Sequence, residues 1–309
     1  MTARVTSDRD PDRRSAGRWR PRMVALDIDG TLVDVQDQIT TTVDAAVRQA
    51  AEAGAYVVLS TGRGLTATKP LAQHFDLALP YLVCSNGAVT VRLHPGGAPA
   101  VGRDGRAHPI DRGNPGLAVG PDVELVDVVT FDAGPVLRML LAQLPDVLVA
   151  VEELGVGYRV SAPFPPGELT GELSVEPLER LIADPVTRVI LREPSIEAEH
   201  FLDVVERVGV HGVSYYIGFT AWLDLAPEGV SKATGLAKVA ERLGVQREDV
   251  LAIGDGTNDV EMLRWAGRGV AMGNAAVEAI EAADDVTAPL DEDGVAVELS
   301  RWFAEISTR

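Results

Sequence analysis

Short apolar runs alternate with amphipathic stretches over the first ninety residues. The run that begins at Met23 stops at two acids, and the runs at 56–59 and 81–84 are equally short. Helical patterns lie between them at 39–53 and 65–75. Strand and helix in strict alternation predict an α/β fold with a parallel, doubly wound sheet.

The same alternation returns after Pro227, whereas the chain between follows another rhythm. The expected elements of the last part are helices at 231–243, 260–265, 275–283 and 295–304, and strands at 250–254, 269–272 and 286–287. The middle predicts helices at 136–144 and 196–208 and strands at 147–152 and 188–191. We therefore expect one core, residues 22–112 and 213–309, interrupted by an inserted α+β domain over 113–212.

Composition and charge narrow the class of protein. The chain has 309 residues, of which 46% are hydrophobic, and a formal net charge of -18. This charge argues against nucleic-acid binding and against an anionic membrane surface. No apolar run approaches the roughly 20 residues that span a bilayer. The single cysteine, Cys84, lies in an apolar run and is expected to be buried, which suits a cytoplasmic location.

The first 21 residues form a polar, arginine-rich segment. They lack the apolar stretch of a secretory signal, and we expect a disordered tail in which Trp19 is the one hydrophobic anchor. Nothing in the sequence indicates the oligomeric state.

Two acids end the first predicted strand. Asp27 and Asp29 are two residues apart, so on a strand they point the same way, at the carboxyl end where open α/β sheets bind ligands. Such a pair suits metal binding and carboxylate chemistry, although a pair of acids that caps a turn explains the same pattern.

Two further segments could bind phosphate. Residues 60–63, Ser-Thr-Gly-Arg, follow the second predicted strand and offer a hydroxyl, a close backbone N–H and a cation. Lys232 lies near a helix start, where a lysine opposes the helix dipole and an anionic partner would favour it. A helix N-cap and an ordinary surface lysine are the alternative interpretations.

The loop at 254–259, Gly-Asp-Gly-Thr-Asn-Asp, follows another buried strand and precedes a helix. It places Asp255, Asn258 and Asp259 at a strand end, and the spacing of an EF-hand calcium loop is absent. A purely structural turn is the alternative. Four such segments on one predicted sheet together supply carboxylates for a metal and donors for a phosphate.

These four segments resemble the ordered motifs of the haloacid dehalogenase superfamily. More narrowly, the chain is similar to the Cof-type phosphatases, which carry a large α/β cap between the second and third motifs. The segments 85–88 (Ser-Asn-Gly-Ala), 229–232 and 271–275 also match that branch. The resemblance covers about 22–90 and 220–300, and the insert matches only in position and length.

The resemblance implies hydrolysis of small phosphate monoesters, such as sugar phosphates or phosphorylated cofactors, through an aspartyl-phosphate. Asp27 would be the nucleophile, and Asp29 the general acid and then the base. Mg²⁺ would be held by the carboxylates of Asp27 and Asp255 and by the backbone carbonyl of Asp29.

The resemblance also implies a phosphate site and a second layer around it. The residues that would hold the phosphoryl oxygens are Thr61, Gly62, Lys232 and Asn258. Asp259 would orient Lys232 or the metal shell. Ser60 is an alternative to Thr61, and Arg63 could contact phosphate or be structural.

The insert would close over the core and set specificity. Residues that could face the cleft, or could be ordinary surface and packing residues, are Tyr158, Arg159, Arg188 and Arg192. A phosphomutase on a sugar phosphate is the alternative function, and a non-catalytic phosphometabolite-binding protein a further one. A dehalogenase of the same superfamily is a less suitable alternative, because it needs neither the second acid, Asp29, nor the acidic loop at 254–259.

Overall fold

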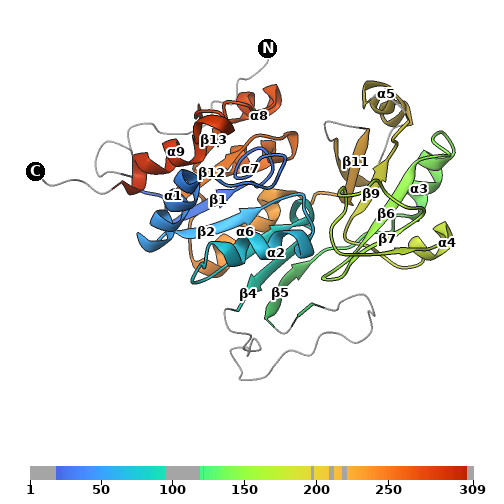
Figure 1. Ribbon diagram of the computed structural model, residues 1–309, viewed down its shortest axis with the longest axis horizontal. Helices are drawn as coiled ribbons and strands as arrows, with labels where there is room; N and C mark the ends of the chain where they lie inside the picture. The colour runs from blue at the N-terminus through green and yellow to red at the C-terminus, as the bar shows by residue number, and fades with distance from the viewer. Residues whose placement is uncertain are drawn as a thin grey trace, which may run out of the picture.

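Two β-sheets, each with its own helices, lie beside each other in the computed structural model (Figure 1). The structure describes residues 19–94, 119–120, 122–195, 198–208, 212–217 and 221–304. The larger sheet has eight strands in the order β14-β13-β12-β1-β2-β3-β4-β5, and the smaller has six in the order β10-β11-β9-β6-β7-β8. The predicted α/β core with an inserted α+β layer is confirmed.

The larger sheet is parallel from β14 to β3 and antiparallel at its other edge. Its strands are β1 (Met23–Leu26), β2 (Tyr56–Ser60), β3 (Tyr81–Cys84), β4 (Val89–Leu93), β5 (Val123–Val128), β12 (Val250–Gly254), β13 (Arg268–Ala271) and β14 (Asp285–Val286). Strand β1 is fully buried because both of its faces are covered. Its residues alternate between two hydrophobic clusters, Val24 and Leu26 in one, Met23 and Ala25 in the other.

Helices cover both faces of this sheet. Those with residues in the cluster of Val24 and Leu26 are α1 (Thr41–Glu52), α2 (Leu65–His74) and α9 (Gly294–Phe303). Those in the opposite cluster are α6 (Lys232–Leu243), α7 (Val260–Trp265) and α8 (Val277–Ala282). We call this sheet with its helices the core; the buried Cys84 belongs to it, as expected.

The smaller sheet and its three helices form the second layer, which we call the cap. Its strands are β6 (Leu148–Glu153), β7 (Gly157–Val160), β8 (Glu172–Val175), β9 (Val189–Arg192), β10 (Val213–Ile217) and β11 (Trp222–Pro227). Its helices are α3 (Gly134–Leu141), α4 (Leu178–Leu181) and α5 (Ala198–Val208). Leu137 of α3 and Phe201 of α5 are fully buried in the cluster that covers one face of the sheet.

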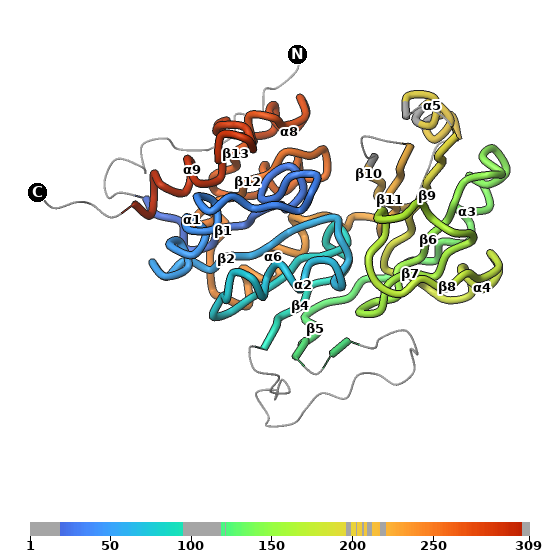
Figure 2. Tube along the Cα trace, viewed as in Figure 1, coloured from blue at the N-terminus to red at the C-terminus, as the bar shows by residue number. Residues whose placement is uncertain are grey.

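The boundaries between the layers differ from those expected at residues 113 and 212. Strand β5 lies in the range expected for the insert, yet it pairs with β4 and extends the larger sheet. Strands β10 and β11 lie in the range expected for the core, yet they form an antiparallel hairpin on β9 in the smaller sheet (Figure 2). Strand pairing decides to which layer a segment belongs.

Trp19, in the N-terminal segment expected to be disordered, contacts the core. The Trp19 ring packs edge-on against Trp302, with centroids 4.8 Å apart, and its Nε1 donates to the carbonyl of Glu248 at 3.0 Å. Trp19 is therefore an anchor. Residues 1–18 of the expected tail, together with residues 95–118 and 121, lie outside the described residues.

In the described part of the chain, no helix combines the length and the apolar character needed to cross a bilayer.

Candidate active site

Parallel pairing brings three strand ends together at one edge of the core. Strand β1 lies between β12 and β2, and Leu26 is in register with both Ile253 and Leu59. Asp27 continues this register, since its N–H donates to the carbonyl of Ile253 at 3.0 Å. The carboxyl ends of the strands thus place residues more than 200 positions apart in one site.

Three carboxylates converge there. Asp27, Asp255 and Asp259 are 4%, 5% and 0% exposed, and one oxygen from each lies within 4.8 Å of the others. Burial, together with the charge of Asp259, holds the pKa of Asp27 well above its ordinary value and raises that of Asp255 to about 6. Clustered carboxylate oxygens are the ligands of a hard divalent cation, so the donor set fits Mg²⁺.

Lys232, the first residue of α6, is buried beside this cluster. Its Nζ donates to Asp27 Oδ1 at 2.5 Å and to Asp259 Oδ1 at 2.7 Å. Burial alone would lower the pKa of Lys232, but the two carboxylates raise it above its ordinary value. The cation at the helix start therefore has internal anionic partners.

The turn after Asp27 contacts Asp255 directly. Thr31 Oγ1 donates to Asp255 Oδ1 at 3.2 Å, and Gly30 has φ +77°. A Cβ at Gly30 would lie 2.2 Å from Asp255 Oδ2, so only glycine fits. Asn274 Nδ2 donates to the carbonyl of Gly30 at 2.9 Å and holds the turn from the other side.

Asp259 fixes the loop that carries Asp255. Its Oδ2 accepts from the N–H groups of Asp255 and Gly256 at 3.0 and 2.9 Å, while its Oδ1 binds Lys232. A Cβ at Gly254 would lie 2.4 Å from Asp259 Cγ. Asp259 thus positions both Lys232 and the loop of Asp255.

Asn258 lies across from the end of β2. Its Nδ2 donates to Asn86 Oδ1 at 2.9 Å, and a Cβ at Gly62 would approach Asn86 Oδ1 to 3.2 Å. Asn86 has φ +53°, a left-handed conformation that asparagine tolerates. Thr61 is fully buried and its Oγ1 accepts from the N–H of Arg63 at 3.1 Å. It does not line the pocket described below, so its phosphate role stays a prediction.

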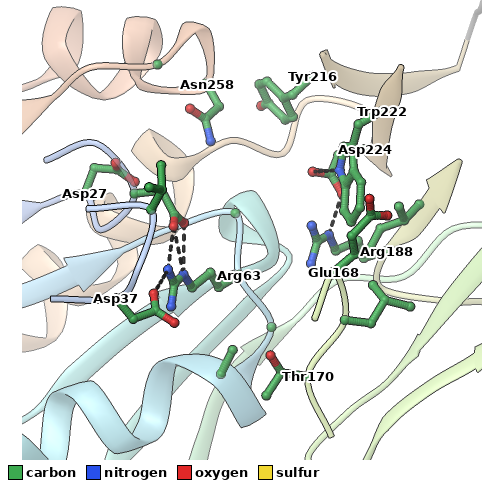
Figure 3. A pocket seen from close by; sticks show the side chains of 18 of the residues that line it. Asp27, Asp37, Arg63, Glu168, Thr170, Arg188, Tyr216, Trp222, Asp224 and Asn258 are labelled. Atoms are coloured by element: carbon green, nitrogen blue, oxygen red, sulfur yellow. Dashed lines mark hydrogen bonds and ion pairs between the residues drawn. The ribbon is translucent and has the colours of Figure 1, made fainter. Parts of the chain in front are cut away.

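Asp29 lies apart from the three buried acids. Its side chain is 59% exposed, and Arg63 Nε donates to its Oδ1 and Oδ2 at 3.1 and 2.9 Å. Arg63 Nη2 donates to Asp29 Oδ1 and to Asp37 Oδ1, both at 2.5 Å. Figure 3 shows the Arg63 and Asp37 side chains joined by a dashed line. The structure thus makes Arg63 a partner of Asp29.

A pocket of about 670 Å³ separates these residues from the cap. From the core, Asp27, Asp29, Gly62, Asp255 and Asn258 line it, whereas Lys232 and Asp259 are buried beneath Asp27. The labelled residues that line it from the cap are Glu168, Thr170, Arg188, Tyr216, Trp222 and Asp224 (Figure 3). The site therefore has a carboxylate floor and a cap wall that faces it.

The four cap residues singled out from the sequence separate into two groups. Arg188 and Tyr158 line the pocket. Arg159 pairs with Glu176 at 3.6 Å and Arg192 with Glu168 at 3.1 Å, and neither lines it.

Several residues of the site were not predicted from the sequence. These are Thr31, Asp37, Asn86, Glu168, Thr170, Tyr216, Trp222, Asp224 and Asn274. The matching segments 85–88 and 271–275 hold Asn86 and Asn274 and were the available signal for these two. The cap residues come from β10, β11 and a loop, and no local motif marks them.

Comparison with known proteins decides the family. A family model described as haloacid dehalogenase-like hydrolase matches residues 24–97 and 174–299, more than half of the chain. The chain belongs to the haloacid dehalogenase-like hydrolases. This match, together with the phosphatases described next, confirms the resemblance to the Cof-type branch and the expectation of an enzyme of the phosphatase class.

Relatives of known name span nearly the whole chain. One is the 5-amino-6-(5-phospho-D-ribitylamino)uracil phosphatase YitU of Bacillus subtilis, 28% identical over 92% of this chain and 98% of its own. Another is a phosphoglycolate phosphatase of Natronomonas pharaonis, 29% identical over 90% of this chain and 96% of its own. The fold matches that of the phosphatase BT1666 from Bacteroides thetaiotaomicron with a TM-score of 0.69, at 24% identity over 93% and 97% of the two chains.

Proposed function

We propose that this haloacid dehalogenase-like hydrolase cleaves small phosphate monoesters with Mg²⁺, through a phosphorylated Asp27. The observation that carries the proposal is the position of Asp27. Its carboxylate lies at the pocket floor, 2.5 Å from the Lys232 ammonium and within 4.8 Å of two more buried carboxylates. A buried carboxylate beside a cation and a metal-type donor set suits attack on phosphorus.

Mg²⁺ would be held by the carboxylates of Asp27 and Asp255, with the backbone carbonyl of Asp29 as the resemblance implies. Bound there, the ion would neutralise the charge between the attacking carboxylate and the phosphate dianion. Asp259 has both oxygens engaged, by Lys232 and by two backbone N–H groups, so we assign it the positioning of these groups.

The chain offers donors for the phosphoryl oxygens around Asp27. Asn258 keeps one amide hydrogen beyond its bond to Asn86, and Gly62 lines the pocket with its backbone. Lys232, which lies beneath Asp27, would stabilise the negative charge that develops on the phosphoryl group. Preorganised donors at the point where charge develops carry much of the catalysis in phosphoryl transfer.

Asp29 would protonate the leaving oxygen and then take a proton from the attacking water. It lines the pocket and is exposed enough to reach both. Arg63 would act as a positioning residue, because its guanidinium group donates to the carboxylates of both Asp29 and Asp37 and so fixes the place of Asp29. The six-stranded cap would exclude water and contact the leaving group.

A pocket of about 670 Å³ suits a metabolite larger than a simple two-carbon phosphate. The compound named for the Bacillus subtilis relative, 5-amino-6-(5-phospho-D-ribitylamino)uracil, is therefore the first natural candidate to assay.

The test compares Asp27→Asn with the unchanged protein on p-nitrophenyl phosphate, with Mg²⁺ and with chelator. We expect kcat to fall at least about a thousandfold in the variant, because the amide is a poor nucleophile. Chelator should abolish wild-type turnover. Asp249→Asn, on the core but outside the pocket, is the matched control and should keep full activity. Parent-rate phosphate release by Asp27→Asn would overturn the proposal.

The phosphomutase alternative predicts a different product. With a sugar phosphate as substrate it transfers the phosphoryl group to a second hydroxyl of the sugar, whereas a phosphatase releases inorganic phosphate. Measuring the two products from one reaction separates the functions.

A further inference from the structure

The cap wall of the pocket carries charged groups that the proposed chemistry does not use. Among the described residues of the cap that line the pocket, Arg188 is basic and Glu168 and Asp224 are acidic. They lie opposite the Asp27 floor, on the side where the leaving group of a bound phosphate ester would be (Figure 3).

Arg188 and Asp224 form a buried ion pair within this wall. Arg188 Nε donates to Asp224 Oδ1 at 2.6 Å, and Nη1 donates to the hydroxyl of Tyr158 at 3.0 Å. Asp224 Oδ2 accepts from Trp222 Nε1 at 3.2 Å. Arg188 and Asp224 are 6% and 9% exposed, so their geometry is set by packing. The charge of the guanidinium is compensated inside the wall itself.

Hydrogen-bonding capacity remains after this pairing. The Nη2 group of Arg188 has no partner among the described residues, and each oxygen of Asp224 has a second lone pair. The wall therefore presents donors and acceptors side by side. A hydroxyl group can use both, whereas a carboxylate or phosphate can only accept.

The other charges around the pocket make it electronegative. Glu168 faces the pocket although its partner Arg192 does not line it. On the core side, the basic lining residue in the described chain is Arg63, which is already shared by Asp29 and Asp37. Each charge of the cap wall is thus paired, Asp224 with Arg188 and Glu168 with Arg192, whereas acids outnumber Arg63 on the core side of the pocket. Among the described lining residues, an anionic leaving group would therefore meet no uncompensated cation in an acidic pocket.

We propose that the Arg188–Asp224 pair determines specificity by selecting phosphate monoesters with an uncharged, hydroxyl-bearing leaving group and disfavouring those that carry a carboxylate or a second phosphate. The inference rests on the proposed phosphatase function and sharpens its substrate class. Trp222 and Ile190 add apolar surface to the same wall, against which the carbon skeleton of such a leaving group can pack.

The test uses two substrates that differ at one carbon. Sorbitol 6-phosphate and 6-phosphogluconate have the same linear skeleton, with a hydroxymethyl group in the first and a carboxylate in the second. We expect kcat/KM of the unchanged protein to favour sorbitol 6-phosphate by at least about tenfold, because the carboxylate meets like charge in a partly desolvated pocket.

Two variants then test the residues. Asp224→Asn leaves the charge of Arg188 uncompensated and should bring the ratio of the two kcat/KM values close to one. Asp184→Asn removes the same charge from an exposed cap position outside the pocket and should leave the ratio unchanged. Thr170→Lys adds a cation at an exposed position of the wall and should shift the ratio in the same direction as Asp224→Asn. This second variant can still refute the inference if Asp224→Asn does not fold.

The outcomes separate this inference from the proposed function. If the unchanged protein does not hydrolyse p-nitrophenyl phosphate with Mg²⁺, the phosphatase function itself is wrong. If it does so but prefers 6-phosphogluconate, or if neither Asp224→Asn nor Thr170→Lys changes the ratio, the phosphatase function stands and the role of the Arg188–Asp224 pair is overturned.

Discussion

Replacing Lys232 with methionine removes a buried cation that bridges two of three buried carboxylates. The ammonium lies 2.5 Å from Asp27 and 2.7 Å from Asp259, and the lysine is 0% exposed. Breaking a buried ion pair by removing one partner typically costs about 3–5 kcal/mol, because the remaining charge stays desolvated. We expect a loss of that size in the free energy of unfolding at pH 7, measured by urea denaturation without metal.

A lysine further along the same helix supplies the control. Lys238 pairs with Asp127 but its side chain is 39% exposed, so Lys238→Met should cost less than about 1 kcal/mol. The loss in Lys232→Met should shrink at acid pH, because the pKa of Asp27 is raised and protonation removes its unpaired charge. If Lys232→Met destabilised the protein no more than Lys238→Met, the inference that Lys232 offsets the buried charges of Asp27 and Asp259 would be wrong.

Three further outcomes follow from the same site. Burial and the charge of Asp259 raise the pKa of Asp255 to about 6, so the metal-free protein should lose stability as the pH rises from about 4 through about 6. Mg²⁺ needs the ionised carboxylate and should therefore raise Tm above pH 6 and little below pH 5; an equal gain at both would contradict this. Arg63→Met should lower kcat about tenfold or more and change the pH profile of kcat, because Asp29 loses the partner that positions it. Arg63→Lys should restore part of the rate, and an unaltered pH profile in Arg63→Met would show that Arg63 does not position Asp29. Gly30→Ala should weaken Mg²⁺ binding, measured by calorimetry, because the added Cβ would lie 2.2 Å from Asp255 Oδ2. Gly54→Ala is the control for backbone strain alone, since Gly54 also has a positive φ but has open space around it.

The sequence predicted the core well because local and tertiary signals agree there. The predicted strands at 81–84 and 250–254 match β3 and β12, and the ends of β1 and β12 bring Asp27 and Asp255 together as expected. Short continuous apolar runs are typical of strands buried on both faces, and parallel pairing fixes where the ends of β1 and β12 lie.

The edges of the layers were not predictable in the same way. Strand β5 has six half-buried residues and no continuous apolar run, and its place in the larger sheet depends on pairing with β4. Strands β10 and β11 are adjacent in sequence and pair with each other, but the sequence of this hairpin does not indicate which sheet it joins. The bridge from Arg63 to Asp29 and Asp37 and the Arg188–Asp224 pair likewise depend on segments that meet only in the folded chain.

Identifying the residue that is phosphorylated during turnover tests the proposed role of Asp27 as the nucleophile. The protein would be mixed with Mg²⁺ and ³²P-labelled phosphate ester, quenched in acid within the first turnover, digested and mapped by mass spectrometry. We expect label on the peptide that contains Asp27, removable by hydroxylamine as an acyl phosphate is, and none in Asp27→Asn. Turnover without any labelled peptide, or label on a different residue, would contradict it.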